Sequence, residues 1–282
     1  MNFTKVQVSN SIFTHATIYD KATVGTTIPT EWNDDMVFNC DFKTLYAGDP
    51  IAYKVDNVQY IVVKRQELVN GIQKWITLIK KLVTKPEDLI FEFTDYLNKD
   101  GSTYQYAIFE IDKQGIEGEY YTSNYVNSCF EKVIVANGNE GYDLTGGATY
   151  NSYSRNQEVG YYTTFGRKYP IGVSNALVDY DAMTTEGYLI KDNKSEYINR
   201  IQQTKYEKDF KNFIVNKKPK IVKDYNGNLW VVLVSGDVSF QPIQEIGNTF
   251  PLVSFSWVEI ATPDDEDELV NCGLLPISPK YE

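Results

Sequence analysis

The sequence has 282 residues, and its 27 Lys and Arg against 38 Asp and Glu give a formal net charge of −11. This acidity argues against a dedicated nucleic-acid-binding protein, which usually carries a basic face. The hydrophobic fraction of 42% and the charged fraction of 23% are ordinary for a globular protein and exclude a wholly disordered chain. The length favours two domains.

Residues 1–35 predict an N-terminal arm or an opening strand pair. Residues 36–126 contain short apolar or alternating runs separated by turn residues, which is typical of a β-sandwich. The Asn70-Gly71 pair suits a tight hairpin. The predicted strands are 37–42, 57–65, 75–79, 89–93, 103–111 and a last one within 117–125.

Residues 127–261 predict a second β-rich domain with a helix near 195–216. Thr204 and Glu207 have the spacing of a capping box, and residues 194–203 are kept as an earlier turn or two of the same helix. Asn226-Gly227 between two apolar runs predicts a hairpin. The Gly-rich stretch 138–147 is interpreted as a surface loop. The remaining predicted strands of this domain are 130–135, 173–180, 185–190 and 250–260.

Residues 262–282 predict an extended acidic tail. Its run from Asp264 to Glu268 lacks the residue order of a Ca²⁺-binding loop, so a solvated charged segment is favoured. The segment from Lys194 to Lys223 has the opposite character, with nine basic and three acidic residues. A solvated helix face is the commonest reading of such a segment, and contact with an acidic neighbouring subunit is the alternative.

The three cysteines, Cys40, Cys129 and Cys272, are far apart and form no C-x-x-C pair, so we expect buried reduced thiols. Neither a secretory signal nor an apolar run long enough to cross a membrane is found. These features lead us to expect a soluble protein made in a reducing cytoplasm.

Catalytic chemistry finds little support. The single histidine, His15, lies in a strand-like run and is interpreted as structural or surface-exposed. The 38 acids offer no spacing that selects one pair for glycoside hydrolysis. We therefore nominate no catalytic, cofactor-binding or metal-binding residue, and we expect no cofactor and no enzymatic activity.

Aromatic residues make up 14% of the chain, including 22 Tyr. Tyr is favoured in strands and at protein interfaces. The pairs Tyr120-Tyr121 and Tyr161-Tyr162 suit either an interface or stacking on a sugar ring, and the interface is the favoured interpretation.

Two resemblances follow from specific strings. The order Tyr60-x-Val62, Trp75-x-x-Leu78 and Leu97 to Tyr104 resembles a fibronectin type III domain over residues 36–126. Leu97 to Tyr104 looks like its tyrosine corner, which implies that the Tyr104 ring is buried and its hydroxyl bonds to upstream backbone. Gly115 to Gly118 looks like a tight turn of the same fold.

The strings Phe165 to Pro170, Lys218 to Asp224 and Val253 to Ile260 are similar to uncharacterised tail proteins of long-tailed bacteriophages. That resemblance implies a non-enzymatic virion protein of the tail tip or baseplate, of the kind represented by the distal tail protein. It would form a homo-oligomeric ring, expected to be a hexamer, with the chain ends 1–35 and 262–282 clasping adjacent subunits and other tail proteins as partners. Binding to nucleic acid and insertion into a membrane are not expected.

Two alternative functions are kept. The first is a carbohydrate-binding or receptor-binding module with an exposed aromatic platform, for which Tyr161 or Tyr162 is the candidate. The second is a cell-wall glycan hydrolase, whose weakness is the absence of a nominated acid pair.

Overall fold

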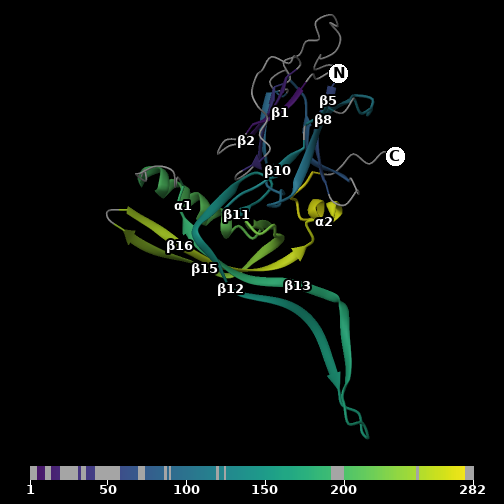
Figure 1. Ribbon diagram of the computed structural model, residues 1–282, viewed down its shortest axis with the longest axis vertical. Helices are drawn as coiled ribbons and strands as arrows, with labels where there is room; N and C mark the ends of the chain where they lie inside the picture. Colours follow the sequence, from purple (N-terminus) through teal and green to yellow (C-terminus); the bar gives the residue numbers. More distant parts are fainter. Residues whose placement is uncertain are drawn as a thin grey trace, which may run out of the picture. The chain divides into compact units, whose positions relative to one another are not determined.

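The computed structural model describes residues 5–9, 14–19, 31–32, 36–41, 58–68, 74–85, 88, 90–118, 121–123, 125–191, 200–245 and 248–276. Strands dominate these residues, which confirms the expectation of a mainly β protein (Figure 1). The chain forms two compact units. The first contains Met1–Gly141, Ile221–Leu229 and Pro263–Glu282, and the second contains Tyr142–Lys220 and Trp230–Thr262.

These units differ from the predicted boundaries at residues 126 and 261. Strand β14 (Lys220–Lys223) pairs with β11 (Val133–Ala136) and thereby brings residues 221–229 back to the first unit. All residues of both strands are buried. Such fully buried four-residue runs give no periodic signal of which sheet they join.

The first unit has two main sheets. One has the strand order β1-β2-β4-β7, from β1 (Lys5–Ser9), β2 (Thr14–Tyr19), β4 (Met36–Asp41) and β7 (Ile90–Asp95). Strands β1 and β2 form the opening strand pair that was one of the two expectations for residues 1–35. They are part of the sheet because β2 pairs in parallel with β4.

The other sheet has the order β3-β10-β8-β5-β6. Its members are β3 (Glu31–Trp32), β10 (Val126–Ser128), β8 (Thr103–Asp112), β5 (Val58–Glu67) and β6 (Trp75–Leu82), with β9 (Tyr121–Thr122) also paired to β8. The pair Asn70-Gly71, predicted to connect β5 and β6, lies outside the described residues. The parallel pairings β2–β4 and β3–β10 depart from the antiparallel sheets of the immunoglobulin-like sandwich, so the fibronectin type III resemblance stays a prediction.

The expected tyrosine-corner contact is present. The Tyr104 ring is fully buried, and its hydroxyl oxygen accepts a hydrogen bond of 2.8 Å from the backbone N–H of Lys99, five residues upstream. The tight turn at Gly115 is also present: Gly115 has a φ of 83°, and the Asp112 carboxylate accepts the N–H groups of Gln114 and Ile116.

The predicted turn at Asn226-Gly227 is confirmed. The backbone N–H of Asp224 donates to the Asn228 carbonyl at 3.1 Å, and the Asp224 carboxylate accepts the N–H groups of Asn226 and Asn228. Gly227 has a φ of 80°, a left-handed conformation that side chains rarely adopt.

Replacing Gly227 with Ala should lower the free energy of unfolding by about 1–2 kcal/mol, measured by chemical denaturation. The added Cβ would meet strain at this φ and would also lie 3.1 Å from the Asp100 carbonyl oxygen. Gly101→Ala is the matched control, because Gly101 has a φ of 71° with nothing within 4 Å of the added atom. Equal losses in both variants would show that the Asp100 contact costs nothing.

The predicted extended tail is wrong for its acidic run. Residues Glu266–Asn271 form the short helix α2, and Asp265 caps it by accepting the N–H groups of Asp267 and Glu268. Leu269, which follows that run, is buried. An N-cap Asp and acids in the first turn suit a helix start, because they face the positive end of its dipole. The acidic side chains themselves are mostly exposed, as the interpretation of a solvated charged segment expects, so the correction concerns the extended conformation alone.

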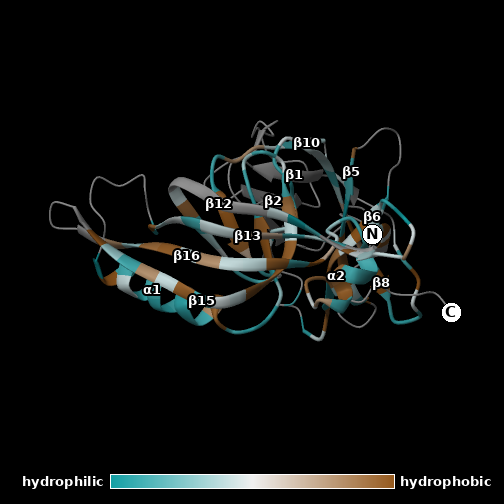
Figure 2. Cartoon of the chain, turned by 90° about the horizontal axis from the view of Figure 1, so that it is seen from below, coloured by the Kyte–Doolittle hydropathy of each residue, from teal (hydrophilic) through white to brown (hydrophobic). Residues whose placement is uncertain are grey.

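The second unit is an antiparallel sheet in the order β12-β13-β16-β15, with helix α1 (Arg200–Ile214) lying along β15 and β16 (Figure 2). Its strands are β12 (Gly141–Tyr162), β13 (Ile171–Leu189), β15 (Leu229–Glu245) and β16 (Asn248–Ala261). Two predictions are wrong here. Residues 141–147 belong to strand β12, not to a loop, and the runs 173–180 and 185–190 are parts of the single strand β13.

The core of the second unit is aromatic. Tyr142 of β12 packs against Tyr206, Phe210 and Phe213 of α1, with ring centroids 4.8–5.2 Å apart. Helix α1 is described from Arg200, so Thr204 lies inside it and its hydroxyl donates to the Arg200 carbonyl. The helix therefore agrees with the expected range near 195–216, but Thr204 does not cap its start. Buried Gln203 joins the helix to the end of β13 by donating to the Leu189 carbonyl at 2.8 Å.

Candidate functional site

The most distinctive surface of the chain is the hairpin formed by β12 and β13. In Figure 1 their paired ends continue well beyond β15 and β16 of the same unit. We call residues 159–173 the arm tip. Every residue of this stretch is exposed, although Val159 to Tyr162 and Ile171 to Val173 are strand residues paired with β13 and β12.

The sequence explains why the arm tip is a hairpin. Tyr162 pairs with Ile171, and Tyr161 pairs with Gly172. The Tyr161 ring lies against Gly172, where a Cβ added to the glycine would be 3.7 Å from ring atom Cε1. Gly166 turns the chain with a φ of 82°. Aromatic and β-branched cross-strand pairs stabilise such a ribbon, but a two-stranded ribbon alone is only marginally stable in water.

The side chains of the arm tip are largely apolar. The exposed fractions are 72% for Tyr161, 62% for Tyr162, 110% for Phe165 and 71% for Tyr169. Val159, Ile171 and Val173 are also exposed. Successive strand residues point to opposite faces, so Tyr161 and Tyr162 lie on the two sides of the ribbon. Exposed apolar residues gathered in this way mark an interaction site.

An ion pair fixes the hairpin where the arm begins. The guanidinium of Arg155 donates to both carboxylate oxygens of Asp179, at 2.7 and 2.8 Å, and lowers the pKa of that carboxyl group. This two-point geometry holds the strands in one orientation. The ion pair therefore orients the two strands that lead to the arm tip. It lies outside residues 159–173 and is no part of the apolar surface of the tip.

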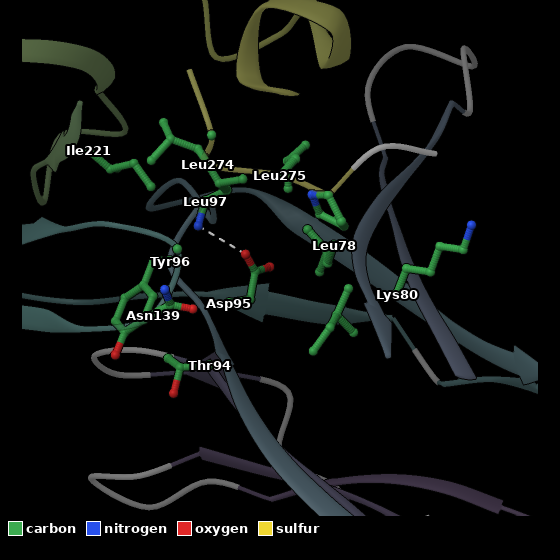
Figure 3. A pocket seen from close by; sticks show the side chains of 14 residues that line it. Leu78, Lys80, Thr94, Asp95, Tyr96, Leu97, Asn139, Ile221, Leu274 and Leu275 are labelled. Carbon is green, nitrogen blue, oxygen red and sulfur yellow. Dashed lines mark hydrogen bonds between the residues drawn. The ribbon is translucent and has the colours of Figure 1, made fainter. Parts of the chain in front are cut away.

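A second candidate is a cavity of about 470 Å³ in the first unit (Figure 3). Its wall is both polar and apolar, and Asp95 is the carboxylate that lies against it. One Asp95 oxygen accepts the N–H of Leu97 at 2.9 Å, the contact drawn as a dashed line. The apolar lining residues include Leu78, Leu97, Ile221, Leu274 and Leu275.

The other oxygen of Asp95 is also engaged. It accepts hydrogen bonds from the Arg65 guanidinium at 2.7 Å and from the Tyr106 hydroxyl at 2.9 Å, and all three side chains are buried. Burial by itself would lower the pKa of Arg65, but Asp95 and the neighbouring tyrosines raise it, so the group stays cationic. Because both oxygens of Asp95 accept protein donors, we interpret this network as structural.

The two buried tyrosines beside Arg65 should make the protein sensitive to alkali. Burial raises the pKa of Tyr104 and of Tyr106 well above the usual value near 10. The folded state therefore holds these protons more tightly than the unfolded chain. Stability is complete below about pH 10 and falls as the pH rises beyond it. Ultraviolet absorbance should show tyrosines that ionise only together with unfolding, and ionisation of every Tyr before the loss of circular dichroism would contradict this.

Other residues singled out by the sequence lie on several strands of the first unit. His15 lies in β2, Cys40 in β4 and Tyr121 in β9, whereas Tyr120 lies outside the described residues. The expectation of buried thiols is wrong for Cys129, which is exposed. Cys272 is partly buried, and this burial raises the pKa of its thiol.

The basic segment 194–223 is only partly a solvated face. Its last two lysines, Lys220 and Lys223, are fully buried, contrary to that interpretation. The Lys223 ammonium donates to Asn98 Oδ1 at 2.6 Å and lies 5.0 Å from the centre of the Phe130 ring. Alternation in the strand Ile221–Lys223 could have indicated one inward-facing lysine, but no sequence signal identifies its partner.

Within the described ranges, no three or more His, Cys, Asp or Glu side chains are grouped as a metal ion would require. None of the helices in those ranges is long and apolar enough to span a membrane. No protein-family model matches the chain, and no curated protein matches it in sequence. The arm tip, with its exposed aromatic side chains, is the candidate site.

Proposed function

We propose that this chain is a non-enzymatic structural protein of a bacteriophage virion. It belongs to the tail tip or baseplate of a long-tailed phage, where it forms a ring that connects the tail to the host-recognition apparatus. A hexamer is the expected ring. The partners are further copies of the chain and other tail proteins, and its location is the virion tail.

The observation that supports this proposal most directly is the arm tip. It holds 15 consecutive exposed residues, four of them aromatic, on a ribbon with both faces open to solvent. Contact with a protein surface removes apolar area from water and stabilises the ribbon. An assembly component gains from such an arm, whereas an enzyme would need a group of reactive side chains in a cleft. The sequence strings similar to phage tail proteins include the turn of this arm, Phe165 to Pro170.

The test is the mass of the purified chain in solution, measured by light scattering over a range of concentrations, with negative-stain electron microscopy of the same samples. The proposal expects closed particles whose mass is a fixed multiple of 32.3 kDa. A chain that stays monomeric at every concentration, or that forms open fibres, would count against a closed ring.

The exposure of Tyr161 and Tyr162 also favours a second candidate, a carbohydrate-binding module on the virion. Flat aromatic rings at the surface can stack on sugar rings. A glycan array probed with the wild-type chain and with Tyr161→Ala tests it. Binding that disappears in the variant would favour this candidate, and an array without signal would exclude the tested glycans as ligands.

A further inference from the structure

The arm tip differs in charge from the rest of the chain. Residues 159–178 contain Arg167 and Lys168 and no acidic residue. This segment is therefore +2, in a chain whose net charge is −11. Both cations lie at the turn of the hairpin, next to Phe165 and Tyr169, and the Lys168 ammonium lies 5.4 Å from the centre of the Tyr169 ring.

This charge pattern narrows the choice of partner. A basic aromatic tip could approach a polyanion such as a nucleic acid, an anionic glycan or an acidic lipid surface. Each of these would repel the remaining residues, which sum to −13. A second protein with the acidity of this chain also attracts the basic tip. Its net charge of −11 is spread over 282 residues, so it presents a lower density of negative charge to the rest of the molecule than a polyanion does.

We infer that the arm tip docks on the acidic surface of a second copy of this chain. This inference rests on the proposed function, because a closed ring needs a head-to-tail contact between two different surfaces of the same protein. The exposed aromatic side chains supply the apolar contact, and Arg167 and Lys168 select an acidic partner. Aromatic residues and Arg are the side chains that most often dominate such interfaces.

The first experiment reverses the charge of the arm tip in the full-length chain. Arg167→Glu with Lys168→Glu should weaken self-association by about tenfold or more, measured by light scattering and sedimentation at several concentrations. The matched control is Lys205→Glu with Lys208→Glu, which makes the same change of charge at two exposed positions of helix α1. The control should associate like the wild type.

A second variant tests the apolar part of the contact. This variant is Phe165→Ser. The Phe165 side chain is fully exposed in the single chain, so the substitution removes no packing from the fold. It should also weaken self-association while leaving the far-ultraviolet circular dichroism and the unfolding midpoint unchanged. Self-association equal to that of the wild type in both arm variants would overturn the inference.

Cross-linking identifies the partner directly. A zero-length carbodiimide reagent joins an ammonium group to a carboxylate that it contacts. In an equimolar mixture of ¹⁴N-labelled and ¹⁵N-labelled chains, mass spectrometry should find Lys168 joined to Asp or Glu peptides of the other isotope. Lys168 joined only to its own copy would contradict the inference.

The outcomes separate this inference from the proposed function. Rings that form normally with the reversed arm tip would overturn the inference and leave the proposed function standing. A wild-type chain that never self-associates would overturn both. An arm tip that binds anionic lipid vesicles or a glycan, while self-association is unaffected by its substitution, would replace the second copy with that ligand.

Discussion

Replacing Asp95 with Asn should lower the free energy of unfolding by about 3–5 kcal/mol. The Arg65 guanidinium is buried and donates to Asp95 at 2.7 Å, so the neutral amide would leave a cation without its counter-charge inside the first unit. The side-chain amide would also place its own N–H groups against groups that now donate hydrogen bonds to the Asp95 carboxylate, such as the Arg65 guanidinium and the Tyr106 hydroxyl. Urea denaturation followed by circular dichroism measures the loss.

The control for this variant is Asp264→Asn. Asp264 pairs with Lys99 at 2.6 Å, but 69% of its side chain is exposed, so its loss should cost at most about 1 kcal/mol. If the two variants lose the same free energy of unfolding, the buried Arg65–Asp95 pair stabilises the fold no more than the exposed pair does. The interpretation of the Asp95 network as structural would then be wrong.

The second large effect is expected at Trp257, in the core of the second unit. Trp257→Ala should cost about 3–5 kcal/mol, because it removes a fully buried ring that packs 5.4 Å from the Trp230 ring. The indole N–H also donates to the Thr185 hydroxyl at 2.8 Å. Denaturant unfolding monitored by circular dichroism gives the size of the loss.

Trp257→Phe separates packing from hydrogen bonding at this position. It keeps an aromatic ring but leaves the buried Thr185 hydroxyl without its indole donor. A loss of about 1–3 kcal/mol is expected from the unmade hydrogen bond and the smaller ring. A Phe variant as unstable as the Ala variant would show that the hydrogen bond matters more than the packing.

Local signals in the sequence were sufficient for much of the fold. The apolar runs 57–65 and 103–111 correctly predicted two strands, and Asn226-Gly227 correctly predicted a turn. Tyr104 was assigned to a buried corner through a resemblance, and its contact with Lys99 matches that assignment. In each of these cases the residues that determine the structure lie close together in the chain.

The errors concern structure that is set by distant residues. Gly146 and Gly147 suggested a loop, but they lie in β12, which pairs with β13. The run from Asp264 to Glu268 was expected to be solvated and extended, and most of it is exposed, but Glu266–Asn271 are helical. Asp264 is paired with Lys99, and the backbone N–H of Thr77 donates to Glu266 at 3.3 Å. Neither partner can be found from the local pattern.

The candidate site was predicted only in part. Tyr161 and Tyr162 were named as exposed aromatics, and both are exposed. The arm itself was missed, because an apolar ribbon exposed on both faces has the same alternation and β-propensity as a buried one. The lack of acidic residues from 159 to 178 was the available signal, since it sets this stretch apart from the acidic remainder of the chain.

The order of the two units along the chain has a consequence for synthesis on the ribosome. Strand β11 is made early, but its partner β14 comes only after residues 142–220 of the second unit. At about 5–20 residues per second this delay is on the order of ten seconds, during which one edge of β11 has no partner. The first unit is complete only when helix α2 has been made. A nascent chain stalled between β11 and β14 should therefore be open to proteases or to chaperones that bind apolar segments, and neither unit can be produced as one uninterrupted fragment.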